Sequence, residues 1–192
     1  MTPELATIIA WVAFFVSWFI AAFWADPAAR RPGLGAESLY RVVTFVGAVL
    51  LFGIYGHSYR GPGRLWFFPD DVEWVLFGVA VLGFLFAWWA RVYLGRLWSS
   101  SVTRKADHHV VDSGPYAIVR HPIYTGILLA AIATAAQKGT LWAVTGVLIW
   151  TLGFWIKARL EERFLREQLG AEAYDSYRRR VPMLVPFGPK AA

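Results

Sequence analysis

The chain contains no cysteine among its 192 residues. This absence excludes a disulfide framework, a thiolate metal site and a cysteine nucleophile. Charged residues are also scarce, at 17%, whereas 57% of the residues are hydrophobic and the mean hydropathy is +0.45. Ordinary soluble domains carry about 25% charged residues. The composition therefore predicts an integral membrane protein.

Several catalytic and binding motifs are missing as well. The sequence has no G-x-G-x-x-G, G-x-x-x-x-G-K-[ST] or G-x-S-x-G pattern, which excludes a soluble-type nucleotide or hydrolase site. The four histidines, His57, His108, His109 and His121, lack the paired spacing of a metal-binding helix, so we predict no metal site. No internal repeat or long linker divides the chain, which predicts a single domain over residues 1–192.

Five apolar stretches approach the length of about 20 residues that a membrane-spanning helix needs. They cover residues 5–25, 39–55, 72–94, 123–137 and 141–156. The first is too long for a signal-peptide core and follows no Lys or Arg, so we expect it to be retained as a span. Only Lys138, Gly139 and Thr140 separate the last two, which predicts a tight helical hairpin. The expected fold is all-α and polytopic, with about five transmembrane helices and a cytoplasmic C-terminal helix that completes the expected active site.

The basic residues predict the orientation of these spans. With the N-terminus outside, sixteen of the nineteen Lys and Arg residues lie on the cytoplasmic side, and Arg60, Arg64 and Lys138 lie outside. This asymmetry follows the positive-inside rule. It also explains the net charge of +6 by attraction to anionic lipid headgroups, so we expect membrane lipids and no nucleic acid as partners.

Ionisable residues are nearly absent within the apolar stretches, which excludes the polar pathway of an ion channel or proton-coupled transporter. Polar residues gather instead in two cytoplasmic regions, residues 95–122 and the chain after Trp155. Any chemistry is therefore expected at the cytoplasmic membrane surface.

The first region includes the stretch SGPYAIVRHPIYTG at residues 113–126. Pro122 suits the first position of a helix, whose unpaired backbone N–H groups would point back at the loop. With Arg120 and His121 beside them, these groups predict a receptor for a carboxylate or phosphate. The alternative is that Arg120 snorkels to headgroups while Tyr116 and Tyr124 form an interfacial aromatic belt.

The second region, residues 157–180, is predicted to continue the fifth span as a charged helix. Lys157 and Glu161 stand four residues apart and can pair on one face. We interpret Glu167, Glu172 and Arg178 as part of a solvated surface. By contrast, charges where a span leaves the bilayer usually have a partner or a function, and three residues lie there: Arg159, Glu161 and Glu162.

Three blocks of the C-terminal half together resemble the isoprenylcysteine carboxyl methyltransferase family. They are LGRLWSSSV at residues 94–102, HHVVDSGPYAIVRHPIYTG at 108–126 and RLEERFLREQLGAEAYDSYRRRVPMLVPF at 159–187. A wider group of membrane methyltransferases also includes phospholipid N-methyltransferases. Sterol reductases carry the related R-H-P-N-Y followed by Gly-Glu, but here Ile123 replaces the Asn and Ile127 the Glu, which favours the methyltransferases.

The resemblance implies a cytoplasmic pocket for S-adenosylmethionine between the loop before the fourth span and the helix after the fifth. Residues 1–94 would supply three N-terminal spans, and residues 95–192 the cofactor loop, hairpin and C-terminal helix. The implied catalytic residues are Arg159, which would hold a substrate carboxylate, and Glu162, the base that an amine acceptor would need. The implied cofactor-binding residues are His108, Val111, Gly114, Tyr116, Arg120, His121, Pro122, Tyr124 and Glu161.

The resemblance further implies methyl transfer to a lipophilic acceptor that enters from the bilayer, most simply the carboxylate of a prenylcysteine-like substrate. A carboxylate needs no general base, so positioning could supply most of the rate. The alternatives are a phospholipid-type N-methyltransferase, an NADPH-dependent sterol-type reductase and a non-enzymatic membrane module. The sequence does not determine the oligomeric state.

Overall fold

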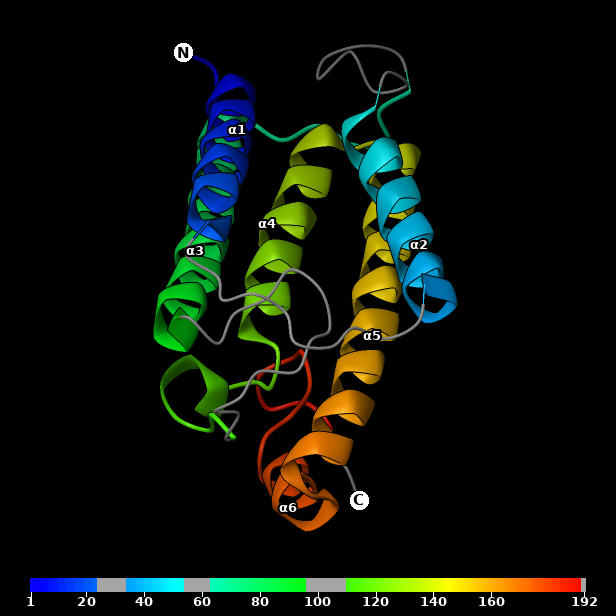
Figure 1. The fold of residues 1–192 in the computed structure, drawn as a ribbon. Coiled ribbons are helices and arrows are strands. Elements are labelled where there is room, and N and C mark those ends of the chain that lie inside the picture. Colours follow the sequence, from blue (N-terminus) through cyan, green and yellow to red (C-terminus); the bar gives the residue numbers. More distant parts are fainter. Residues whose placement is uncertain (24–33, 54–62, 96–109, 191–192) are drawn as a thin grey trace.

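The computed structural model describes residues 1–23, 34–53, 63–95 and 110–190, and the regular elements within these ranges are helices (Figure 1). One isolated bridge pairs Arg64 with Thr140. The elements are α1 (Pro3–Ala22), α2 (Leu34–Phe52), α3 (Asp70–Leu94), η3 (Gly114–Ala117), α4 (Pro122–Lys138), α5 (Leu141–Leu169) and α6 (Ala171–Arg180). The all-α prediction is confirmed for the described residues.

Each of the five predicted apolar stretches overlaps one helix, α1 to α5 in chain order, within the described residues. Three of the helices in the described ranges, α1, α3 and α5, are long and apolar enough to cross a membrane. Helix α4 has 17 residues, or about 26 Å at the usual rise of an α-helix, which is slightly less than the hydrocarbon core. The count of five spans and the cytoplasmic orientation remain predictions.

The predicted hairpin between the last two stretches is confirmed. Helix α4 ends at Lys138, and Gly139 adopts the left-handed conformation with φ 60°, from which its N–H donates to the carbonyl of Ala135. The Thr140 hydroxyl then accepts from the backbone N–H of Ala143 and caps α5. A left-handed C-terminal residue followed by an N-capping threonine is a common way to reverse the chain between helices.

Helices α3 and α4 pack closely along their length, as do α2 and α5 (Figure 1). Glycine allows this approach at both contacts. A Cβ atom at Gly83 would lie 2.5 Å from the carbonyl oxygen of Gly126, and one at Gly47 would lie 2.6 Å from the backbone nitrogen of Trp150. Close backbone contact through small residues is a main source of helix association in membranes.

A buried polar network ties α1, α3 and α4 together. The Thr7 hydroxyl donates to Gln137 Oε1 at 2.8 Å, and Gln137 Nε2 donates to the carbonyl of Glu73 at 2.8 Å. The indole N–H of Trp11 donates to the Thr134 hydroxyl at 2.9 Å. Such bonds are strong in a low-dielectric interior, and they fix the rotation of α4 between its neighbours.

The charged helix predicted over residues 157–180 is divided in the structure, so its continuity was wrong. Helix α5 ends at Leu169, and Gly170, with φ 89°, redirects the chain into α6. That φ lies in a region that side chains other than glycine rarely adopt. Helix α6 then packs back against η3, where the Tyr177 hydroxyl donates to the carbonyl of Tyr116 at 2.7 Å. Burial of Tyr177 raises the pKa of its hydroxyl, which stays a donor.

Candidate active site

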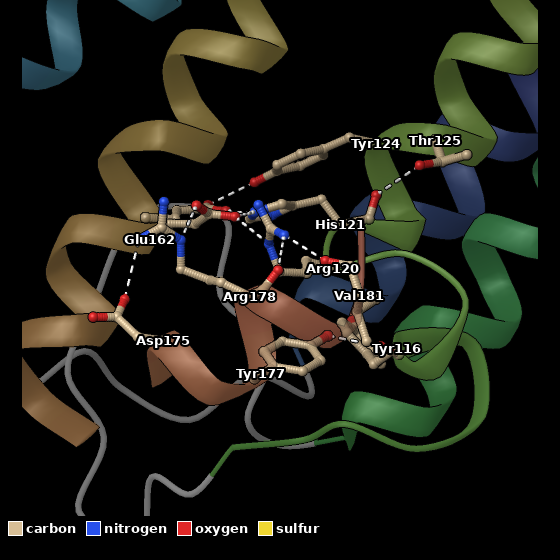
Figure 2. A network of polar contacts seen from close by, with 11 residues as sticks. Tyr116, Arg120, His121, Tyr124, Thr125, Glu162, Asp175, Tyr177, Arg178 and Val181 are labelled. Carbon is tan, nitrogen blue, oxygen red and sulfur yellow. Dashed lines mark hydrogen bonds and ion pairs between the residues drawn. The ribbon is translucent and has the colours of Figure 1, made fainter. Parts of the chain in front are cut away.

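Polar side chains converge at the end of the bundle where α4 begins. Figure 2 shows them directed toward one another from the loop before α4, the second half of α5 and α6. Figure 1 places α6 and the C-terminal segment at this same end, opposite the N-terminus. The two polar regions that the sequence singled out therefore form one site.

Arg120 is buried at the centre of this site. Its side chain is 3% exposed, and Nε donates to Glu162 Oε1 at 2.6 Å. Nη1 donates to the carbonyls of Arg178, at 3.1 Å, and Val181. Arg120 therefore does not snorkel to headgroups, and the carboxylate that it holds belongs to the protein itself.

The C-terminal segment lies against the start of α4. The backbone N–H groups of Arg120 and His121 donate to the carbonyls of Pro182 and Met183, at 2.9 and 3.1 Å. The Thr125 hydroxyl donates to the carbonyl of Leu184 at 2.6 Å. Backbone atoms of residues 182–184 thus complete the site, a role that their side chains could not have revealed.

His121, which precedes α4, faces both carboxylates of α5. Its Nδ1 lies 3.5 Å from Glu161 Oε2, and its Nε2 lies 3.3 Å from Glu162 Oε1. Burial lowers the pKa of His121, but the hydrogen bonds and charges of Glu161 and Glu162 outweigh burial and raise it. The imidazole is stacked on the Tyr124 ring, with a centroid separation of 5.4 Å.

Glu161 also receives contacts from its other side. The Tyr124 hydroxyl donates to Glu161 Oε1 at 2.6 Å, and Lys157 Nζ lies 3.9 Å from the same oxygen. The predicted pairing of Lys157 with Glu161 is therefore confirmed. The Lys157 ammonium also lies over two aromatic rings, 5.2 Å from the Tyr124 centroid and 5.6 Å from that of Tyr40. Sequence reasoning missed Tyr40, since only the packing of α2 on α5 brings it here.

Arg178 contributes from α6, which corrects its interpretation as a solvated surface residue. Its Nε lies 3.3 Å from Glu162 Oε2, and its Nη1 donates to Asp175 Oδ1 at 3.1 Å. The hydrogen bond from Arg166 lowers the pKa of Asp175, desolvation opposes this shift, and the hydrogen bond from Arg178 adds to the lowering. Because α6 folds back at Gly170, a residue sixteen positions after Glu162 becomes its neighbour.

Several predicted cofactor residues shape the loop before α4. Gly114 has φ 56°, and a Cβ atom there would lie 2.7 Å from the Tyr93 ring. Tyr116 is buried, and its hydroxyl donates to the carbonyl of Ala90 at 3.4 Å. Val111 packs against the core, and Pro122 is the first residue of α4, as predicted. His108 lies outside the described residues.

Arg159 does not join this cluster. It lies on the exposed face of α5, and in the described part of the chain its guanidinium contacts the Trp155 ring, 5.6 Å from the centroid. Trp155 is itself 46% exposed. The structure therefore leaves Arg159 exposed on α5, in contact with Trp155.

Several known proteins are similar in sequence to this chain. The cobalt-zinc-cadmium resistance protein CzcN of Cupriavidus metallidurans is 36% identical over 148 residues, 76% of this chain and 60% of that protein. Methanethiol S-methyltransferase 2 of Bradyrhizobium diazoefficiens is 35% identical over 134 residues, 65% of this chain and 51% of the enzyme. The protein-S-isoprenylcysteine O-methyltransferase of Schizosaccharomyces pombe is 33% identical over 106 residues, 52% of this chain and 43% of the enzyme.

The chain thus spans about half the length of the curated relatives that it matches. Residues 74–167, from α3 through most of α5, match the model of a methyltransferase family whose members take their methyl group from S-adenosylmethionine. Apolar helices and this match together identify an integral membrane protein. The predicted resemblance to the isoprenylcysteine carboxyl methyltransferase family is confirmed by this match over residues 74–167.

Proposed function

We propose that this protein is a membrane methyltransferase that binds S-adenosylmethionine at the cluster of His121, Tyr124 and Glu161. The observation that carries the proposal is the buried junction of the R-H-P-x-Y element with the two glutamates of α5. Polar groups at such a depth usually serve a function or a specific partner. The family match covers both halves of this junction.

The chemistry of the cluster fits the methyl donor. S-adenosylmethionine carries a sulfonium and an amino group, both cationic, and a flat adenine. Glu161 is a carboxylate with 18% of its side chain exposed, and Tyr124 is stacked between His121 and Phe154. A carboxylate beside aromatic faces is a favourable environment for a cation. When bound, the donor would supply an electrophilic methyl group.

We assign different roles to the two glutamates. Glu161 would bind the donor together with His121 and Tyr124. Glu162 has Oε1 on Arg120 and His121, and its Oε2 faces Arg178. A carboxylate compensated by this many cations is a poor base, since nearby positive charge favours its ionised form. We therefore propose that Glu162 positions the site, and that Arg120, Val111, Gly114, Tyr116 and Pro122, with His108, shape the pocket.

The charges favour an anionic acceptor over an amine. Arg159 on the outer face of α5 is a cation that contacts no carboxylate among the described residues, and its planar guanidinium can bind a carboxylate through two hydrogen bonds. Lys157 adds a second cation near Glu161. An amine would instead need a base to remove its proton, and Glu162 is engaged. We propose the carboxylate of a prenylcysteine-like lipid as acceptor, and a thiolate as the second candidate because one relative is a methanethiol S-methyltransferase.

A site at the membrane surface, as the sequence predicts, would favour this reaction. Transfer of a methyl group from a sulfonium to an anion cancels two opposite charges, so a water-poor site favours it over solution. A lipophilic acceptor dissolved in the bilayer would meet Arg159 on the exposed face of α5, beside Trp155. The residues of the chain would then act by orientation rather than by proton transfer.

An acceptor panel tests the proposal. The purified protein in phospholipid nanodiscs would receive S-adenosylmethionine labelled on its methyl group, together with a prenylcysteine analogue, the methyl ester of that analogue, a small thiol or phosphatidylethanolamine. We expect label on the free carboxylate and none on the ester. Label on the amine in preference to the carboxylate and the thiol would contradict the anionic-acceptor assignment.

A further inference from the structure

The segment after α6 advances along α4 toward its apolar part. Its carbonyls at Pro182 and Met183 bond to Arg120 and His121, and the next, at Leu184, bonds to Thr125. Thr125 is one turn further into α4 than His121, a step of about 5.4 Å. In Figure 1 the red trace that follows α6 rises to the lower end of α4 before it turns back.

The segment reaches α4 on its exposed face. Thr125 shares this face with Leu129 and Ile132, which follow at i+4 and i+7 and are 39% and 54% exposed. Almost all other residues of α4 are buried among the described helices. In an integral membrane protein an exposed apolar stripe of this kind faces lipid. The chain that leaves Leu184 therefore emerges at the foot of a lipid-facing stripe.

Two large apolar side chains follow at this position. Val185 is 65% exposed and Phe187 is fully exposed. Phe187 also has φ 61°, a left-handed conformation that is uncommon for a bulky residue. The Gly188 N–H donates to the Val185 carbonyl at 2.9 Å, so the two side chains project from a closed turn. The turn thus presents apolar surface that the described part of the protein does not cover.

The flanking charges match a membrane surface. Arg179 and Arg180 end α6, Arg180 with its guanidinium 2.8 Å from Asp112, and Lys190 follows the apolar turn, so cations stand on both sides of it. Aromatic and aliphatic side chains bracketed by basic residues are typical of segments that lie in the headgroup region.

We propose that residues 185–187 form a hook that inserts into the bilayer interface beside α4. The hook would hold the segment whose carbonyls bond to Arg120 and His121, and it would thereby couple the membrane to the geometry of the site. This inference rests on the fold and does not depend on the proposed enzymatic activity.

The absence of cysteine allows a direct test. A nitroxide would be attached to Phe187→Cys in vesicles of phosphatidylcholine and phosphatidylglycerol, and its collisions with oxygen and with a water-soluble nickel complex compared. Ile132→Cys on the exposed face of α4 serves as the lipid reference, and Glu172→Cys on the exposed surface of α6 as the water reference. We expect the label at position 187 to collide more often with oxygen than with the nickel complex, as the label at position 132 should.

A second position guards against a folding defect. Val185→Cys lies on the same turn, and its label is expected to collide with oxygen more often than with the nickel complex. This variant keeps the test informative if Phe187→Cys does not fold. If the labelled turn collides with the nickel complex as freely as the Glu172 label does, the hook is excluded.

Discussion

Arg120 and Glu162 form a buried ion pair, with Nε 2.6 Å from Oε1. The pair links the loop before α4 to the second half of α5. The two residues are 42 positions apart, and their side chains are 3% and 5% exposed. Arg120 also binds two carbonyls at the end of α6. This pair therefore joins three segments and sets the position of His121, which follows Arg120 directly.

Removing the acid from this pair should destabilise the protein. In Glu162→Ala, the buried Arg120 would lose its counter-charge, which typically costs about 3–5 kcal/mol. The measurement is the free energy of unfolding in mild detergent. Glu167→Ala is the matched control, because Glu167 is an exposed glutamate on the same helix and should cost less than about 0.5 kcal/mol. Equal losses in the two variants would remove the structural role of the pair.

A bulky residue at the α3–α4 contact should prevent packing. In Gly83→Leu, the new Cβ would lie 2.5 Å from the Gly126 carbonyl, so the helices must separate. Gly78→Leu on the same helix is the control, because no atom lies within 4 Å of a Cβ there. We expect the first variant to lose monodispersity in size-exclusion chromatography and the second to keep it. A monodisperse, equally heat-stable Gly83→Leu protein would argue against this helix contact.

Stability should depend on the charge of His121. The raised pKa means that the folded protein holds the His121 proton more tightly than the unfolded chain does. The resulting stabilisation is fully present below the unfolded pKa of about 6.5 and is lost as the pH rises through the raised folded value. The difference in Tm between the wild type and His121→Gln should therefore be largest below about pH 6.5 and shrink as the pH rises through the raised folded pKa. A difference that grows with pH would contradict the assigned charge.

Arg159 should matter for turnover and not for donor binding. Its guanidinium lies on the exposed face of α5, in contact with Trp155, so Arg159→Ala should leave the affinity for S-adenosylhomocysteine within about twofold. Methyl transfer should fall by at least about a hundredfold, since the loss of a paired carboxylate contact costs about 3 kcal/mol. Arg163→Ala, an exposed arginine one turn later, should keep both properties. Retained turnover in Arg159→Ala would remove Arg159 from the proposed role.

Local signals in the sequence predicted the helices and the turn between α4 and α5. Hydropathy predicted five stretches, each of which overlaps a helix in the described residues, and Gly139 with Thr140 indicated the reversal. Pro122 correctly indicated the start of α4. The break at Gly170 was missed, because a glycine inside a charged helical pattern is tolerated or disruptive depending on contacts made elsewhere. Here those contacts are made by Tyr177 and Arg178, which hold α6 against η3 and α5.

The sequence predicted which residues lie at the candidate site better than it predicted the contacts between them. The R-H-P-x-Y element and the paired glutamates could be marked from residue type and depth, and the structure brings them together. Tyr40 could not be marked, because its role depends on how α2 packs along α5. The carbonyls of residues 182–184 could not be marked either, since every residue has one. Arg120 was expected to face a ligand, and its side chain instead holds Glu162.

Calorimetric titration with S-adenosylhomocysteine tests the central claim most directly. The wild type in detergent or nanodiscs should bind it saturably at one site and should not bind NADPH. Glu161→Gln should weaken this binding by at least about tenfold, because it removes the charge that we assign to the donor site. Unchanged affinity in Glu161→Gln would move the donor away from this cluster, and binding of NADPH without S-adenosylhomocysteine would contradict the methyltransferase assignment.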